Sequence, residues 1–224
     1  MTPTSKLRFA GLIAAALLLQ ACGNSPYRAD PFRTLYDSLF KGDGEPTKIT
    51  AQQIVQTLSA TDRPVAFLEI IERDSQSLLI RIEQNGGYDS FATPTRQAVT
   101  MRHGMIVGTR GLGGDLMSVE EDAVLRVVRA RESRDNVIYV QRFLTPEYLT
   151  ESLTYTCNIE PDKSVDAAMG LVNTHATEGV VACTGEDLVP FVDYYVVDSN
   201  GEIVASRQWL GEVTGYVAMH MLRL

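Results

Sequence analysis

Histidine, tryptophan and cysteine are all scarce in this chain, which has three, one and three of them in 224 residues. The histidines are His103, His175 and His220, and none belongs to a ligand spacing that metal sites use. The Gly-x-Ser-x-Gly and His-Glu-x-x-His motifs of hydrolases and metalloproteases are missing too. We therefore expect no catalytic residue, no metal and no cofactor, and a protein that is not an enzyme.

Positive charge is outnumbered by negative charge, with 20 Lys and Arg against 28 Asp and Glu, a net charge of −8. An acidic surface of this kind argues against binding to nucleic acid or to anionic lipid. Beyond the N-terminus, no apolar stretch reaches the roughly 18 residues of a membrane span. A hydrophobic content of 45% is typical of a folded globular body.

The N-terminus has the pattern of a bacterial lipoprotein signal. Lys6 and Arg8 precede the apolar run Phe9–Leu19, whose length of about 11 residues suits a secretory signal and is too short to span a bilayer. The segment Leu19–Cys22 reads Leu-Gln-Ala-Cys and fits the lipobox, in which the cysteine sulfur receives a diacylglycerol. We predict cleavage before Cys22, its acylation, by palmitate among other chains, and stable anchoring by two or three chains. The alternative is an ordinary secretory signal that happens to contain a cysteine.

This signal divides the chain into a signal peptide (1–21), a lipidated tether (22–30) and a single periplasmic β-rich domain (31–224). The 203 residues left after cleavage are enough for one domain with an ample core. Loss of Lys6 and Arg8 takes the net charge from −8 to about −10. Gly23 rather than aspartate follows the cysteine, which predicts sorting to the outer membrane, with the body facing the periplasm.

Two cysteines remain once Cys22 is acylated. Cys157 and Cys183 would be an even pair in an oxidising compartment, where disulfides persist, so we predict a disulfide between them. The segment Leu153–Ile159 alternates between apolar and polar residues, which would place Cys157 on a buried face. Two buried free thiols are the alternative.

Three helices are expected, and two of them precede the β-rich part. The first is Pro31–Lys41, and the second starts at Thr50 with Gln53 as its capping-box partner. The buried stripe of the second is expected to hold Ile54, Val55 and Leu58. The third is a short helix over 118–131 with Ser118 and Glu121 as its capping box, although its valines also suit a strand.

Short apolar segments between turn signals fill most of the remaining chain. The turns are 85–87, 103–104 and 198–201, each of which contains glycine. The predicted strands are Val65–Glu72, Leu78–Glu83, Ala98–Arg102, Met105–Thr109, Leu153–Ile159, Gly179–Thr184, Phe191–Val197, Ile203–Leu210 and Tyr216–Leu222. Such spacing predicts a mainly β fold: an antiparallel β-sandwich or partly open barrel with one or two short N-terminal helices.

Three segments contain residue types that catalytic or ligand-binding sites use. The glycine cluster Gly108–Asp115 lacks the spacing of a phosphate loop, so a tight turn is favoured over a ligand loop. The acidic run Glu120–Asp122 is interpreted as a solvated helix start rather than an acid/base site. Trp209 is interpreted as a core residue, with sugar stacking as the alternative.

Two of these segments resemble a known family. Residues 97–113 contain Gly-x-Ile-x-x-Thr-x-Gly-Leu from Gly104 to Leu112, and the C-terminal part contains Ser-Arg-Gln-Trp-Leu at 206–210 followed by Gly-Tyr-Val at 215–217. With the lipobox, these motifs resemble the YjbF and GfcB family of group 4 capsule polysaccharide lipoproteins over most of the mature chain. The cysteine pair is not among the residues that carry the resemblance.

The resemblance implies a role in making or exporting an exopolysaccharide, with an outer-membrane β-barrel partner and a periplasmic companion protein, and it implies no enzymatic activity. We expect docking through a loop contact made by Arg110, Gly111, Leu112 and Gly113, together with Trp209, and we expect Arg110 and Leu112 to project as a charged and an apolar anchor. Two alternatives stay open. A polysaccharide-modifying enzyme would need paired carboxylates, and a polysaccharide-binding module would need exposed aromatic rings such as those of Trp209 or Tyr194.

Overall fold

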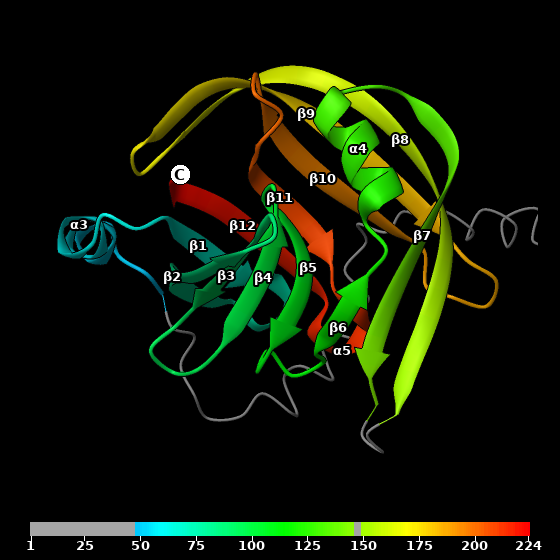
Figure 1. Cartoon of the computed structure of the whole chain (residues 1–224), viewed down its shortest axis with the longest axis horizontal. Helices are drawn as coiled ribbons and strands as arrows, with labels where there is room; N and C mark the ends of the chain where they lie inside the picture. The colour runs from blue at the N-terminus through cyan, green and yellow to red at the C-terminus, as the bar shows by residue number, and fades with distance from the viewer. Residues whose placement is uncertain (1–47, 146–148) are drawn as a thin grey trace, which may run out of the picture. The chain divides into compact units, whose positions relative to one another are not determined.

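One antiparallel sheet of twelve strands runs through the residues that the structure, a computed structural model, describes: 48–145 and 149–224 (Figure 1). In spatial order the strands are β5 (Met105–Arg110), β4 (Ala98–Arg102), β3 (Tyr88–Ala92), β2 (Ser75–Asn85), β1 (Val65–Ile70), β12 (Tyr216–Arg223), β11 (Ile203–Trp209), β10 (Phe191–Asp198), β9 (Val172–Thr184), β8 (Thr150–Met169), β7 (Arg134–Leu144) and β6 (Leu116–Val119). The helices are α3 (Ala51–Ala60), the 3-10 turn η2 (Ile71–Arg73), α4 (Asp122–Ala130) and α5 (Gly211–Thr214). The predicted signal peptide, Cys22, the tether and the helix Pro31–Lys41 lie outside the described residues.

The two edge strands of this sheet, β5 and β6, follow one another in the chain and lie side by side. The Leu116 amide donates to the Thr109 hydroxyl at 2.9 Å, and the Arg110 guanidinium donates to the Leu116 carbonyl at 3.2 Å. Side chains therefore bridge the seam in place of a backbone ladder. The sheet curls into a nearly closed antiparallel barrel, which confirms the predicted fold class.

Glycine turns set the register of the hairpins where the sequence predicted them. His103 and Gly104 both have positive φ (49° and 82°), which is the geometry of a two-residue hairpin turn between β4 and β5. Gly86 and Gly87 make the corresponding turn between β2 and β3, where Asn85 pairs with Tyr88. The strands predicted around the 198–201 turn and at the C-terminus are likewise present as β10, β11 and β12.

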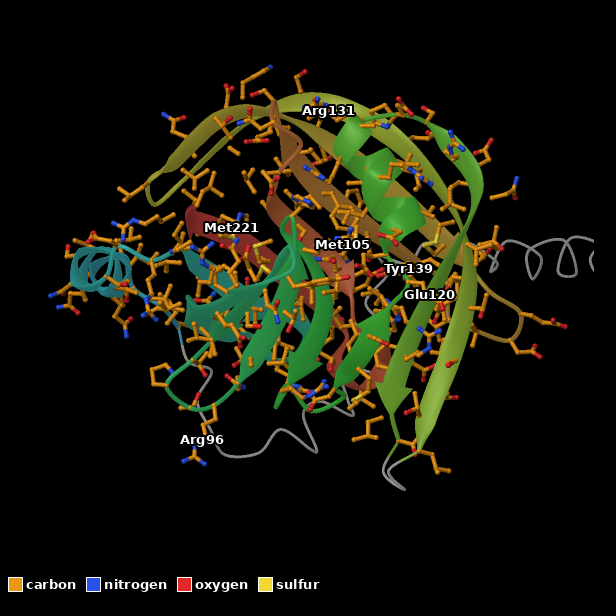
Figure 2. The ribbon with its side chains drawn as sticks, viewed as in Figure 1. Arg96, Met105, Glu120, Arg131, Tyr139 and Met221 are labelled. Carbon is orange, nitrogen blue, oxygen red and sulfur yellow. A yellow bond between two sulfur atoms is a disulfide. The ribbon has the colours of Figure 1, made fainter. Side chains whose placement is uncertain are left out.

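Apolar residues that alternate along the strands fill the inside of the curved sheet. Met105 of β5 and Tyr139 of β7 are buried there and lie within the curve of the ribbon, whereas Arg96 projects into solvent from a turn (Figure 2). The helix α4 packs against β7, β8 and β10 and buries four residues in the same core: Val124, Leu125, Val127 and Val128. None of the helices described here is long and apolar enough to cross a membrane.

The predicted disulfide joins Cys157 and Cys183, which face each other on β8 and β9 and are both buried. Their neighbours Tyr155 and Ile159 are buried on the same face of β8, as the alternating pattern predicted. The bond therefore links the adjacent strands β8 and β9 within the core.

The helix predicted from Thr50 is α3, and its capping box is present: the Thr50 hydroxyl accepts from the Gln53 amide at 3.2 Å. Ile54 and Leu58 pack on a small cluster outside the barrel, around Phe67 of β1. The inclusion of Val55 in the buried stripe was wrong, because its side chain is 62% exposed. Val55 follows Ile54 by one residue and so points about 100° away from it around the helix.

The helix predicted over 118–131 exists but begins later, at Asp122. The expected capping box was wrong, because Ser118 lies in β6 and no side chain caps α4 at Glu121. The strand predicted as Val65–Glu72 ends at Ile70, where η2 takes over. The strand predicted at 179–184 is longer than expected: β9 begins at Val172 and so includes His175.

The long β8–β9 hairpin extends beyond its neighbour β10 and arches over the outer face of the barrel (Figure 1). The register shifts between Pro161 and Ser164, where the hairpin bends. Its tip passes β10 and β11 and is held on β12, because the Leu171 amide donates to the Leu222 carbonyl at 2.7 Å. The part of the hairpin beyond the register shift, residues 164–177, is called the arch, and it covers an apolar part of the outer surface.

Candidate functional site

The glycine loop between β5 and β6 is held in one shape by its own residues. The Asp115 carboxylate accepts hydrogen bonds from the amides of Gly111 at 3.0 Å and Leu112 at 3.2 Å. Gly111 and Gly113 have φ of 77° and 109°, a region that favours glycine. The loop is therefore the tight turn predicted from the sequence, and the Asp115 carboxylate points back into it.

Two more elements hold the loop from outside. The Arg73 guanidinium donates to the Leu112 carbonyl and, at 2.9 Å, to the Val213 carbonyl of α5. The Thr214 hydroxyl donates to the Gly114 carbonyl at 2.9 Å. A Cβ on Gly113 would lie 2.7 Å from Arg73 Nη2, so the absence of a side chain there makes room for the guanidinium. The loop and α5 therefore form one rigid surface.

The candidate contact residues of the loop divide into exposed and buried ones. Arg110, Gly111 and Gly113 are exposed. The expectation that Leu112 projects from the loop was wrong: it is only 2% exposed and belongs to the core. Because its amide is bound by Asp115, its side chain turns inward under the loop.

Trp209 is a core residue, as the sequence favoured, with 6% of its surface exposed. Its ring stacks on Phe191 at 6.4 Å between centroids and makes an edge contact with Tyr216 at 5.1 Å. Tyr194, the other candidate ring, is partly buried and lies 5.8 Å from the Arg207 guanidinium. The Trp209 ring therefore offers no open face for a sugar.

A groove with a volume of about 400 Å³ adjoins the loop and α5. Trp209, Tyr155 and Phe143 form its aromatic floor. Gly211 (φ 81°) lies so close that an added Cβ would be 2.9 Å from the Phe143 ring, which lets α5 form one wall. The other walls come from residues 144–145 at the end of β7, from residues 151–153 of β8 and from the turn between β9 and β10. The remaining lining residues are Gly114, Leu144, Thr145, Glu151, Leu153, Asp187, Leu188, Val189, Leu210, Glu212 and Val213.

The acidic run Glu120–Asp122 is more than the solvated helix start predicted from the sequence. Glu121 is only 5% exposed, and its carboxylate accepts from the Tyr88 hydroxyl at 2.8 Å and the Arg102 guanidinium at 2.9 Å. Hydrogen bonds from Arg102 to Glu121 and Asp122 raise the pKa of this arginine further. Glu120 pairs with Arg142. The cluster ties β3 and β4 to the start of α4 across the barrel seam.

A second polar network lies in the core around Asp193 of β10. Its carboxylate accepts from the Trp209 amide at 2.7 Å and from the Tyr195 hydroxyl at 3.2 Å. Burial raises the pKa of Asp193 to about 8, although these hydrogen bonds oppose the rise. Gln208 accepts from the Ile106 amide of β5 at 3.1 Å, and Gln141 donates to the Trp209 carbonyl at 3.1 Å. These side chains connect strands across the interior.

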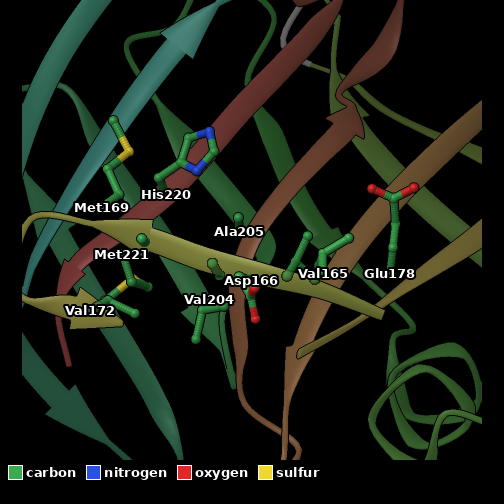
Figure 3. Close-up of a pocket in the computed structure, with 12 residues that line it drawn as sticks. Val165, Asp166, Met169, Val172, Glu178, Val204, Ala205, His220 and Met221 are labelled. Atoms are coloured by element: carbon green, nitrogen blue, oxygen red, sulfur yellow. The ribbon is translucent and has the colours of Figure 1, made fainter. Parts of the chain in front are cut away.

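An apolar pocket of about 300 Å³ lies under the arch (Figure 3). Val196, Ala205 and His220 are cross-strand neighbours on the outer face of the sheet and form one side. Met169 of the arch faces them, and Glu178 lies at the opposite end of the pocket. Burial lowers the pKa of His220, so the imidazole is neutral at pH 7.

These sites differ in what they can do. The interior network is sealed and serves structure, and among the described residues no group of three histidine, cysteine or carboxylate side chains is placed to hold a metal. The loop and its groove offer an open, rigid and partly apolar surface, which suits contact with another molecule. Sequence reasoning found the loop and Trp209 but missed the groove, because its walls come from four separate segments.

Comparison with known proteins points to one family. The model described as "Group 4 capsule polysaccharide lipoprotein gfcB, YjbF" matches residues 32–222. The fold is similar to that in the crystal structure of the hypothetical lipoprotein YmcC from Escherichia coli (K12), with a TM-score of 0.63 and 17% identity over 88% of this chain and 97% of that one. At that identity the likeness concerns the fold alone. No curated protein matches the chain.

Proposed function

Because this chain belongs to the family of group 4 capsule polysaccharide lipoproteins, we propose that it is a non-catalytic lipoprotein that assists secretion of an exopolysaccharide by docking on an outer-membrane β-barrel. The membership supports a role in a capsule or exopolysaccharide process, and it agrees with the lipid anchor expected at Cys22. The outer membrane, the periplasmic orientation, the barrel and a periplasmic companion protein belong to the proposal.

The observation that carries docking is the rigid loop surface. Three side chains hold the loop through hydrogen bonds: the Asp115 carboxylate, the Arg73 guanidinium and the Thr214 hydroxyl. A surface that is ordered before binding loses little conformational entropy when a partner binds. The exposed Arg110, Gly111 and Gly113 are the proposed contacts, while Leu112 and Trp209 lie in the core.

The two alternative functions find less support in the geometry. Binding of a polysaccharide by stacking needs an open aromatic face, and Trp209 is 6% exposed. Acid/base chemistry on a sugar needs two carboxylates on either side of the bond. Glu121 and Asp122 are adjacent and share the guanidinium of Arg102, which is an arrangement for ion pairing.

Co-purification from membranes tests the docking proposal. The lipidated chain should bring down the β-barrel of the export system, and Arg110→Ala should weaken this. Because the Arg110 guanidinium also donates to the Leu116 carbonyl at the seam, the melting temperature of this variant is measured alongside and should fall only slightly, since one hydrogen bond is lost. Arg126→Ala is the matched control, since Arg126 is also exposed but lies on α4. Equal recovery with Arg110→Ala would remove the loop from the interface, and absence of any barrel would refute docking.

A further inference from the structure

We infer that the groove beside α5 binds a segment of a partner protein in which an aliphatic or aromatic side chain is flanked by lysine or arginine. This inference rests on the proposed function for the existence of a protein partner, and it adds the chemistry of the segment and its place on this chain. The groove is lined by Gly114, which directly follows the proposed contact Gly113 in the loop, so the groove and the contact surface adjoin.

Exposed aliphatic side chains surround the groove. Val213 of α5 is 68% exposed, Val189 is 43% exposed and Leu144 is 38% exposed, and all three line it. Isolated apolar residues are common on protein surfaces, but a cluster of them around one concavity marks an interaction site. Leu153 and Leu188 lie deeper, so an inserted apolar side chain would meet hydrocarbon on several sides.

Acidic residues rim the same groove. Glu151, Asp187 and Glu212 line it and are exposed, and none of the described residues that line it is lysine, arginine or histidine. Arg73 reaches the edge at Val213, but its guanidinium is held by the carbonyls of Leu112 and Val213. Within the described part of the chain, no ion pair involves the three carboxylates. Positive charges beside the apolar side chain of the partner would complement this rim.

Other occupants fit these observations less well. A sugar would stack on an open ring, whereas the rings of Trp209 and Tyr155 are 6% and 2% exposed. A second copy of this chain also has a net charge of −8, so its surface would bring more negative charge to the rim. A cationic, apolar protein segment satisfies the side chains and the charge together.

Photo-crosslinking in living cells tests this inference with the full, lipidated chain. p-Benzoylphenylalanine replaces Val213, and the crosslinked segment is sequenced by mass spectrometry. The expected product is a partner segment with lysine or arginine next to an apolar residue. The same substitution at Val189, on another wall, should capture the same segment and guards against a folding defect at α5.

Charge variants give the quantitative arm of the test. The triple change Glu151→Gln, Asp187→Asn and Glu212→Gln should lower the crosslinking yield about tenfold, because three rim ion pairs are lost. The control triple Asp62→Asn, Glu83→Gln and Glu132→Gln removes the same charge from exposed carboxylates elsewhere and should leave the yield unchanged.

Capture of an acidic segment, of polysaccharide, of a second copy of this chain or of nothing at both positions would overturn the inference. A yield that the groove triple does not lower, or that both triples lower equally, would also overturn it. Failure of the proposed function is a separate result: a cationic segment could be captured from a protein unrelated to export, and secretion would then be normal without this gene.

Discussion

At the scale of single residues, the core of this barrel contains more polar chemistry than its strand pattern suggests. Asp193, Tyr195 and Gln208 are buried and bind one another or backbone amides. Removing a charge from water is costly, so a buried carboxyl group holds its proton more tightly. Asp193 has a raised pKa of about 8 and is mostly protonated at pH 7.

This protonation makes stability depend on pH in a defined direction. Between the unfolded pKa of about 3.9 and the folded pKa of about 8, the folded state keeps a proton that the unfolded state releases. The free energy of unfolding should therefore fall as pH rises through this window, by up to about 1.4 kcal/mol per unit, and level off above it. Asp193→Asn should remove this contribution, as measured by urea unfolding from pH 5 to 8.

The partly buried His220 provides an opposite dependence. Its pKa is lowered by burial, so its contribution is present above the ordinary pKa of about 6.5 and is lost as pH falls below that value. Wild type and Asp193→Asn both contain His220, so the difference between their free energies of unfolding isolates the contribution of Asp193. Identical pH slopes in the two chains would show that Asp193 is ionised in the folded protein.

Leu112 lies beneath the glycine loop and is 2% exposed, so truncating it should affect stability directly. Leu112→Ala should lower the free energy of unfolding by about 2–5 kcal/mol, because it leaves a cavity in the core. Val55→Ala is the control, since Val55 is 62% exposed and its truncation should change little. A Leu112→Ala chain as stable as wild type would mean that this side chain faces outward.

At the scale of elements, the β8–β9 hairpin combines a buried disulfide near its base with an arch over the outer face of the sheet. The hairpin continues past β10 into the arch, whose exposed positions are mostly polar or charged. The Cys157–Cys183 bond holds its base in the core. This combination lets a long hairpin extend over the outer face while its origin stays fixed.

Reduction of that bond should destabilise the chain. With a sequence separation of 26, the chain-entropy estimate is about 3.5 kcal/mol. Urea unfolding with and without dithiothreitol measures the loss, and the double variant Cys157→Ala and Cys183→Ala should not respond to the reductant. If dithiothreitol leaves the wild-type midpoint unchanged, the bond contributes no stability.

The elements that could be predicted from sequence are those with local signals. The hairpin at His103-Gly104 and the alternating strand at Leu153–Ile159 each carry their own turn or pattern. The strands β3, β6 and β7 were missed. In β7 the inward residues are Val137, Tyr139 and Gln141, and the buried glutamine breaks the apolar alternation. In β3 only Phe91 is fully buried.

The candidate site shows the same limit more strongly. The glycine loop is contiguous in sequence and was found, but its inward-facing leucine depends on Asp115 and on the packing beneath it. The groove brings together residues at 114, at 143–145 with 151–155, at 187–189 and at 209–213. No local pattern connects these segments, because only the curl of the sheet places them side by side.

At the scale of the whole molecule, the described unit is a nearly closed, acidic barrel with one rigid loop surface beside an open groove. The whole chain has a net charge of −8, and this charge and the carboxylates around the groove suit a positively charged partner. The lipid expected at Cys22 would confine the chain to a membrane, where contact with a membrane partner needs no search through the periplasm. Membrane attachment is therefore part of the proposed function.

Secretion of polymer by living cells tests the central claim most directly. In a strain without this gene, we predict that exopolysaccharide at the cell surface falls sharply, that wild type and Arg126→Ala restore it, and that Cys22→Ala and Arg110→Ala do not restore it fully. Export of polymer at the normal level without the gene would contradict the proposed function.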